Sequence, residues 1–220
     1  MIATLFDFDG VLVDSEPVHL AAFNDVLAPY GVVIGPDEYA ARYLSLDDAG
    51  VFGQVLSRVG RAPTDDEVRA LVASKTPRFL ERFAGAFRAF PGAIELVARR
   101  AERGPVGIVS GALEQEIVFA LGKMALLGKV AFIVSADSGT LSKPEPAPYL
   151  LALEKLRMFG DLPAAVAIED SLGGIASAKR AGLRCVAVAH SYPLDDLTRA
   201  GADRAVSDLA ELTDVLLDGA

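Results

Sequence analysis

Five short apolar segments, separated by helical stretches, constrain the fold of this chain more than any other feature. Each segment is continuously apolar instead of alternating, which is typical of strands buried on both faces of a parallel sheet. The predicted strands are Ile2–Phe6, Val106–Val109, Phe132–Val134, Ala165–Ile168 and Cys185–Ala189, with a weaker sixth strand at Arg204–Val206.

Helical stretches lie between most of these strands. The predicted helices are Ala93–Arg103, Glu114–Leu121, Pro148–Leu156 and Gly173–Ala181. Strands that alternate with helices over short connections form right-handed crossovers in a layered fold. The predicted fold class is therefore α/β, with a doubly wound, Rossmann-like parallel sheet.

One region interrupts this alternation. From Ser15 to about Gly85 the sequence predicts helices and no strand. The predicted helices are Pro17–Leu27, Asp47–Val59 and Thr64–Phe83. Their apolar residues recur with a helical period, so each helix has one face to bury. We predict an all-helical domain at residues 15–85, inserted into an α/β core domain formed by residues 1–14 and 86–220.

Composition excludes several classes of protein. The 220 residues include 30 acidic and 21 basic side chains, a net charge of −9, which argues against a nucleic-acid partner. Cys185 is the single cysteine, so neither an intramolecular disulfide nor a multi-cysteine metal site is possible. The sequence lacks both a long apolar run and a signal-peptide core before Asp7, which predicts a cytoplasmic protein without a membrane partner.

The first acidic pair, Asp7 and Asp9, directly follows the first predicted strand, and Gly10 permits the turn that comes next. Open α/β sheets place their ligand crevice beyond the carboxyl ends of such strands. The alternative is that both acids only cap a loop. Two acids at the end of a buried strand are costly without a cation, however, so we favour a functional site.

A second acidic pair, Glu169 and Asp170, ends the fourth predicted strand. If both strands belong to one parallel sheet, four carboxylates gather at the same edge. Like charges at that separation raise each other's pKa unless a cation intervenes. Hard oxygen ligands without histidine or cysteine suit Mg²⁺. The two pairs therefore predict a magnesium site.

Two further loops end at the same predicted edge. Ser110 and Gly111 follow the second strand and offer a hydroxyl and backbone N–H groups at a helix start, which is a cradle for an anion. Lys143 follows the third strand in a proline-rich loop, from which a fixed positive charge would reach the acids. Each loop alone is usually just a turn. Four polar loops at successive strand ends form a much stronger pattern.

With these motifs the chain resembles the haloacid dehalogenase-like phosphohydrolase superfamily. It is similar to the subgroup with a helical cap after the first strand, near β-phosphoglucomutase and the sugar-phosphate and phosphoglycolate phosphatases. The resemblance covers essentially the whole chain: the Asp-x-Asp-Gly start, the serine after the second strand, the lysine before a helix and the Glu-Asp pair. These motifs are specific for the superfamily and poorly specific for a substrate.

The resemblance implies a role for each motif. Asp7 is similar to the nucleophile that forms an aspartyl-phosphate, and Asp9 to the general acid/base. Ser110 and Gly111 would bind the phosphoryl group, which Lys143 would join to the nucleophile. The Mg²⁺ ligands that the resemblance implies are Asp170 with Glu169, the Asp7 carboxylate and the Asp9 carbonyl.

Residues of the helical region are weaker candidates for substrate specificity. Lys75 lies in the apolar phase of its helix, so it either snorkels at the edge of the stripe or faces the cleft to bind the distal part of the substrate. His19 is equally open to a structural role or a place in the cleft. Arg42 and Ser45, near the loop that opens the third helix, are further candidates.

The leading hypothesis is a Mg²⁺-dependent phosphatase for a small phosphorylated metabolite such as a sugar phosphate. The alternative is a phosphomutase similar to β-phosphoglucomutase. A mutase must hold a second phosphate, and β-phosphoglucomutase has an arginine in its cap loop. The corresponding loop here is Leu44-Ser45-Leu46-Asp47-Asp48, without an arginine, which weakens the mutase hypothesis. A third hypothesis is an inactive homologue that acts in binding or regulation. The intact set of polar motifs argues against it.

Overall fold

The computed structural model describes residues 2–44, 46–160 and 164–219. The chain divides into two compact units: a sheet unit of Met1–Asp14 with Ala89–Ala220, and a helical unit of Ser15–Arg88. The assignment of residues 15–85 as a separate inserted domain stays a prediction.

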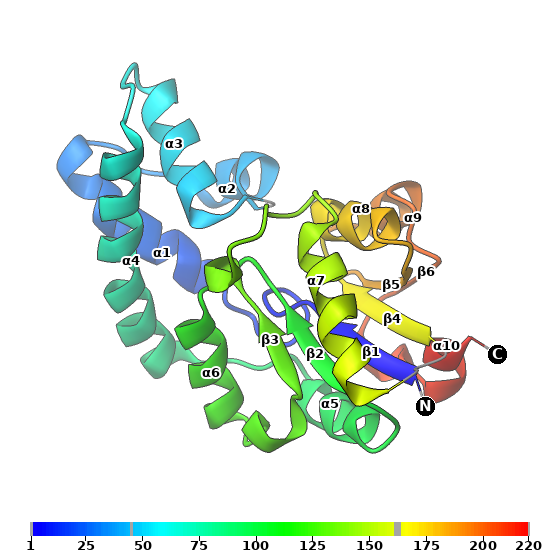
Figure 1. The fold of residues 1–220 in the computed structure, drawn as a ribbon. Coiled ribbons are helices and arrows are strands. Elements are labelled where there is room, and N and C mark those ends of the chain that lie inside the picture. The colour runs from blue at the N-terminus through cyan, green and yellow to red at the C-terminus, as the bar shows by residue number, and fades with distance from the viewer. Residues whose placement is uncertain (1, 45, 161–163, 220) are drawn as a thin grey trace. The chain divides into compact units, whose positions relative to one another are not determined.

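The sheet unit contains six parallel strands in the order β3-β2-β1-β4-β5-β6 (Figure 1). They are β1 (Ile2–Phe6), β2 (Val106–Val109), β3 (Phe132–Val134), β4 (Ala164–Glu169), β5 (Arg184–Val188) and β6 (Arg204–Val206). All six predicted strands are confirmed, with shifts of one residue at the ends of β4 and β5. The predicted α/β class with a doubly wound parallel sheet is therefore confirmed.

Helices cover both faces of this sheet. The α-helices are α5 (Ala93–Ala101), α6 (Glu114–Lys123), α7 (Ala147–Leu156), α8 (Leu172–Arg180), α9 (Leu194–Arg199) and α10 (Asp214–Asp218). Short 3-10 helices are η2 (Leu127–Lys129), η3 (Ala136–Ser138), η4 (Arg157–Phe159) and η5 (Leu209–Glu211). Tyr149 of α7 and Ile175 of α8 share one core cluster with Leu5 of β1. On the opposite face, Arg100 of α5 donates to Thr4 Oγ1 at 2.9 Å.

Strand order explains where a site forms. β1 lies between β2 and β4. The chain first forms β2 and β3 on one side of β1, and then forms β4, β5 and β6 on the other side. Phe6 pairs with both Ile108 and Ile168, which aligns the carboxyl ends of the three strands. The Asp7 N–H also donates to the Ile168 carbonyl at 2.9 Å. Ligand crevices of open α/β sheets lie at such a reversal of strand order.

The helical unit consists of α1 (Glu16–Leu27), η1 (Ala28–Tyr30), α2 (Pro36–Arg42), α3 (Asp48–Arg58) and α4 (Asp65–Ala86). Its described residues contain no strand, in agreement with the prediction. Its own core is built from buried residues that include Phe23, Phe52 and Leu71. Thr64 starts α4 with a reciprocal capping box to Glu67, which satisfies two backbone N–H groups at the helix start.

Two composition-based expectations can be compared with this fold. None of the described helices combines the length and apolar character that a bilayer crossing requires. Cys185 is fully buried in β5. Burial raises the pKa of its thiol far above the ordinary value, which keeps the group protonated and unreactive.

Candidate active site

Three acidic side chains converge at the carboxyl ends of β1 and β4. Asp7 follows β1, Glu169 ends β4 and Asp170 comes next. One carboxylate oxygen from each lies within 4.8 Å of the others. All three residues are buried. Burial and the neighbouring charge of Glu169 raise the pKa of Asp7 well above its ordinary value. The protein alone therefore disfavours the ionised form of Asp7, and a bound cation would favour it.

Lys143 links two of these acids. Its Nζ lies 3.0 Å from Asp7 Oδ1 and 2.6 Å from Glu169 Oε1, and it also donates to the Val109 carbonyl at 2.8 Å. These three contacts use all three protons of an ammonium group. Burial disfavours the charged form, but the two carboxylates outweigh it and raise the pKa of Lys143 above its ordinary value. Lys143 is therefore a fixed positive charge at neutral pH.

Glycine is required at two positions around the cluster. Gly10 has φ +76°, and a Cβ at this residue would lie 1.9 Å from Asp170 Oδ2. At Gly174 a Cβ would lie 1.8 Å from Glu169 Oε2. Any larger residue at either position would displace a carboxylate from the cluster. The Gly10 turn therefore serves the site as well as the backbone conformation.

Hydrogen bonds at Phe8 and at Gly10 hold the turn after β1 in place. The Phe8 N–H donates to Asp7 Oδ1 at 2.8 Å, which fixes the orientation of that carboxylate. His190 Nδ1 donates to the Gly10 carbonyl at 2.7 Å, and its ring stacks on Phe90 with the centroids 3.8 Å apart. Partial burial lowers the pKa of His190, so its ring is neutral at pH 7. Asp9, half-buried in this turn, lies close enough for its charge to raise the pKa of Asp7 further.

Ser110 directly follows Val109, whose carbonyl accepts from Lys143. Ser110 is buried, and its Oγ accepts from the Ala112 N–H at 3.0 Å. That bond orients the side chain and leaves the hydroxyl hydrogen available to a ligand. Gly111 is exposed beside it, and no atom lies within 4 Å of the position that a Cβ would take. The backbone at this loop is therefore accessible to an incoming group.

The donor set of the cluster fits Mg²⁺. Asp7, Glu169 and Asp170 offer hard carboxylate oxygens, which Mg²⁺ prefers. When all three acids are ionised, the ammonium of Lys143 balances one of their charges, and a divalent cation would balance the other two. Glu169 Oε1 already accepts from both Lys143 and Tyr149, each at 2.6 Å.

Among the described residues, three side chains that touch the cluster were not predicted from the sequence: Tyr149, Ser191 and Ser171, whose Oγ donates to Glu169 Oε2 at 3.4 Å. The Tyr149 hydroxyl donates to Glu169, and the Ser191 hydroxyl donates to Asp170 Oδ2. Ser191 comes just after β5, at the same sheet edge, so the strand-end rule that located the other loops applies to it too. Tyr149 lies inside the predicted helix Pro148–Leu156. The sequence signal for Tyr149 is weaker. A buried tyrosine needs a hydrogen-bond partner for its hydroxyl, but the sequence does not show which residue that partner is.

In the helical unit, Lys75, His19 and Asp48 form a buried lysine cluster. Lys75 Nζ donates to Asp48 Oδ1 at 2.6 Å and lies 2.7 Å from His19 Nδ1. It also lies over the rings of Phe23 and Phe79, at 4.5 and 5.3 Å from their centroids. The Lys75 side chain is fully buried, so it does not snorkel to water as one sequence-based alternative held. A contact between Lys75 and the substrate stays a prediction.

The other two specificity candidates are Arg42 and Ser45. Arg42 is exposed at the end of α2. Ser45 lies outside the described residues. Their roles stay predictions.

Comparison with known proteins identifies the family. The haloacid dehalogenase-like hydrolase family matches residues 4–188, which is most of the chain. The chain belongs to the haloacid dehalogenase-like hydrolases. It is 34% identical to protein CbbY of Cereibacter sphaeroides over 96% of this chain and 93% of that protein. It is 32% identical to an N-acetylmuramic acid 6-phosphate phosphatase of Pseudomonas aeruginosa, over 97% and 94% of the two chains.

Solved structures agree with this haloacid dehalogenase-like assignment. CbbY from Rhodobacter sphaeroides in complex with phosphate superposes with a TM-score of 0.83 at 29% identity, covering 99% of this chain and 100% of that one. A CbbY mutant has been solved with xylulose-(1,5)bisphosphate, and it superposes with a TM-score of 0.80 at 29% identity, covering 96% of each chain. By homology the chain is an enzyme of the haloacid dehalogenase-like phosphatase type, a phosphoric monoester hydrolase.

Proposed function

We propose that this enzyme hydrolyses the phosphate monoester of a small metabolite, with Mg²⁺ as cofactor and with Asp7 as the residue that becomes phosphorylated. One observation carries the proposal. Lys143 bridges Asp7 and Glu169 inside a buried cluster of three acids, so a fixed cation adjoins a carboxylate that is held by a backbone N–H. A loop cap has no need of such an arrangement.

The main barrier to attack by Asp7 is electrostatic. A carboxylate and one unit of phosphate charge at about 3.5 Å repel by about 5 kcal/mol at an effective dielectric of about 20. A phosphate monoester carries close to two such charges at neutral pH. Lys143, 3.0 Å from Asp7 Oδ1, is placed to offset part of this repulsion. Ser110 is placed beside Val109 to donate its hydroxyl to a phosphoryl oxygen.

The reaction divides into two displacements at phosphorus. In the first, an Asp7 carboxylate oxygen bonds to phosphorus, the bond from phosphorus to the substrate oxygen breaks, and Asp9 protonates that leaving oxygen. In the second, Asp9 takes the proton from a water molecule. The water oxygen bonds to phosphorus, phosphate departs and the Asp7 carboxylate is restored. Asp9 thus alternates between acid and base, which requires a pKa near the working pH.

Asp7, Asp170 and the Asp9 carbonyl are the groups that we assign to Mg²⁺, together with Glu169. When bound, the metal would supply positive charge opposite the phosphoryl oxygens. Because Glu169 also accepts from Lys143 and Tyr149, its second task is to hold the ammonium beside Asp7. Ser191 orients Asp170 in a similar way.

The buried lysine cluster favours a substrate with a single phosphate. Asp48 lies 2.6 Å from Lys75 and balances its charge, and His19 is its other polar neighbour. A charge-balanced lysine has no net charge with which to bind a second phosphate. We therefore favour a phosphatase acting on a sugar or polyol monophosphate over a phosphomutase or a bisphosphatase.

A substrate panel tests this proposal. Phosphate release would be measured from glucose 1-phosphate, N-acetylmuramic acid 6-phosphate and xylulose 1,5-bisphosphate, each with Mg²⁺ and with EDTA. We expect kcat/KM to be at least tenfold higher for a monophosphate than for the bisphosphate, and no release in EDTA. Preference for the bisphosphate would reject the monophosphate assignment. Release that is indifferent to EDTA would reject the metal.

The phosphomutase alternative has a separate test. Incubation with glucose 1-phosphate and a trace of its bisphosphate distinguishes the two activities by product. We expect free phosphate. Isomerised sugar phosphate without free phosphate would instead show a mutase.

A further inference from the structure

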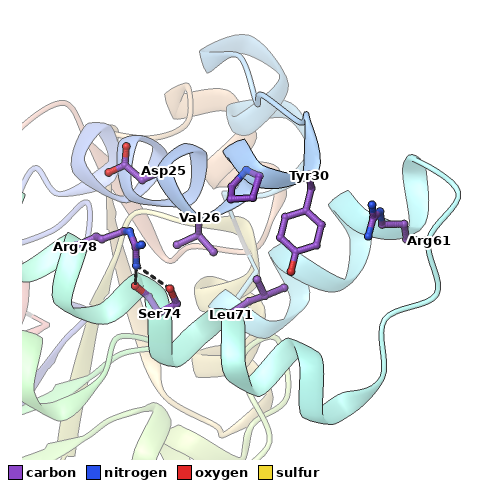
Figure 2. A pocket seen from close by; sticks show the side chains of 8 residues that line it. Asp25, Val26, Tyr30, Arg61, Leu71, Ser74 and Arg78 are labelled. Atoms are coloured by element: carbon purple, nitrogen blue, oxygen red, sulfur yellow. Dashed lines mark hydrogen bonds between the residues drawn. The ribbon is translucent and has the colours of Figure 1, made fainter.

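The helical unit contains a pocket of about 350 Å³ between α1, η1 and α4. Figure 2 shows Arg78 on one side of it and Arg61 on the other, with Val26 and Leu71 between them. None of the residues proposed for catalysis or specificity lines this pocket. It thus combines an apolar floor with two guanidinium groups and has no part in the proposed reaction.

Both arginines lack a carboxylate partner among the described residues. Arg78 Nη1 donates to the Ser74 carbonyl at 2.6 Å and to Ser74 Oγ at 2.7 Å, which are neutral groups on its own helix. Arg61 lies over the ring of Tyr30, 5.0 Å from its centroid. The chain has 30 acidic residues and a net charge of −9, so two arginines without a carboxylate partner at one pocket are unexpected.

The carboxylates near the pocket are already engaged. Asp25, at the rim, accepts two hydrogen bonds from Arg82, at 2.7 and 2.8 Å. Glu67 is close enough to feel the charge of Arg61, but its carboxylate accepts from the Thr64 N–H at 2.7 Å in the capping box. Asp25 is thus paired with Arg82 and Glu67 is held in the capping box, so the described residues record no ion pair between either acid and Arg61 or Arg78.

We propose that this pocket binds a small organic oxyanion with a flat apolar body. Arg78 binds the phosphate or carboxylate head, because a planar guanidinium donates two parallel hydrogen bonds to either group. Arg61, on the other side of the pocket, adds a longer-range attraction for the same negative charge. The apolar floor at Val26 and Leu71 and the ring of Tyr30 take the apolar body. Arg78 gives up only two neutral hydrogen bonds when it turns to the ligand.

Titration of the Mg²⁺-loaded, ¹⁵N-labelled protein with phenylphosphonate tests the proposal by NMR. This probe combines an aromatic ring with a phosphonate, and its carbon–phosphorus bond is not a phosphate ester. The side-chain Nε–H signals of Arg61 and Arg78 report on the pocket itself. Binding of the probe at the catalytic cluster would therefore not be mistaken for binding at the pocket. We expect both signals to shift with one saturable curve.

Variants and further probes sharpen this reading. Arg61→Gln and Arg78→Gln should each weaken binding at the pocket at least fivefold. Arg157→Gln, at an exposed arginine of η4, should leave it unchanged. Inorganic phosphate, which lacks a ring, should bind more weakly than phenylphosphonate. Benzoate shows whether the head group preferred is a carboxylate or a phosphonate.

Signals of Arg61 and Arg78 that do not saturate, or equal affinities in Arg78→Gln and Arg157→Gln, would overturn the proposal. Equal binding of inorganic phosphate and phenylphosphonate would overturn the role of the apolar floor. The phosphatase assay is independent of these outcomes. Both arginine variants should keep the wild-type turnover and melting temperature, so a failure of the pocket and a failure of the proposed function give different results.

Discussion

Two lysines with little exposed surface, one in each unit, show how the same side chain meets different electrostatic demands. Lys143 in the sheet unit contacts two carboxylates, Asp7 and Glu169, with Asp170 close by. Among the described residues, Lys75 in the helical unit contacts one carboxylate, that of Asp48, and a histidine. The first cluster retains excess negative charge, whereas the second is balanced.

The acidic cluster around Lys143 is therefore suited to bind a cation, whereas the ion pair of Lys75 and Asp48 needs no further charge. An excess of buried carboxylates must either take up a proton, as the raised pKa of Asp7 indicates, or bind a cation, because burial opposes every uncompensated charge. A balanced pair has no such need and is held by its own ion pair and by aromatic neighbours. Ligand charge should therefore affect the sheet unit strongly and the lysine cluster weakly.

The largest expected effect comes from the nucleophile. Asp7→Asn removes the attacking oxygen, so Mg²⁺-dependent phosphate release should fall below detection. Release of phosphate from a preferred monophosphate is the measurement, with circular dichroism to confirm folding. A wild-type rate in this variant would end the assignment of Asp7.

Asp9→Asn should reduce turnover at least about a hundredfold, the usual range for the loss of a general acid/base. Because the change conserves shape at a half-buried position, the melting temperature should stay near that of the wild type. Steady-state kcat is the measurement. A normal kcat would mean that the proton follows another route.

Mg²⁺ should raise the melting temperature, because it joins three buried carboxylates in the folded state only. At a metal concentration about 100-fold above Kd, the stabilisation is about 2.7 kcal/mol. Thermal unfolding with MgCl₂ and with EDTA measures it. Asp170→Asn should remove most of the shift, whereas Asp48→Asn, in the balanced cluster, should keep it. A shift lost equally in both variants would contradict the comparison.

Asp48→Asn should itself lower the free energy of unfolding by about 2 kcal/mol, less than for a completely buried pair because Asp48 is partly exposed. The loss arises because Lys75 is left buried without a countercharge. Urea unfolding measures the change. In the double variant with Lys75→Met, part of this loss should be recovered. If the two changes simply add, the pair is not coupled.

Lys75→Met should have the smallest effect on catalysis. A charge-balanced lysine contributes hydrogen bonds and little net charge, so KM for a monophosphate should rise by only a few-fold, with kcat nearly unchanged. An unchanged KM would reject any contact between Lys75 and the substrate. A loss of kcat as large as that of Asp9→Asn would show that the cluster takes part in the chemical step.

The strands were predictable because strand burial leaves a local signature. A strand covered on both faces must be apolar at every position, and Ile2–Phe6 and Val106–Val109 match their predictions to the residue. The acids at the ends of β1 and β4 were predictable for a related reason. Polar residues that interrupt an apolar segment at the carboxyl end of a strand need a partner, and the parallel sheet directs them to one edge.

Other features depend on contacts between residues far apart in the chain. The hydrogen bond from Tyr149 to Glu169 and the bond from Ser191 to Asp170 have no local pattern. Even at Gly174, only five residues from Glu169, the need for glycine depends on where the folded chain places that carboxylate. The pairing of Lys75 with Asp48 spans 27 residues and depends on how α3 packs on α4.

By itself, the sequence determined the class of fold, the order of its elements and the edge of the sheet at which the acids lie. Those properties follow from hydrophobic pattern and strand polarity, which are local and repeat along the chain. Only the tertiary structure decided that Lys143 bridges Asp7 and Glu169, that Lys75 is balanced by Asp48, and that Arg61 and Arg78 share a pocket. Charge balance at a point is a sum over neighbours in space, and spacing along the chain does not specify which neighbours those are.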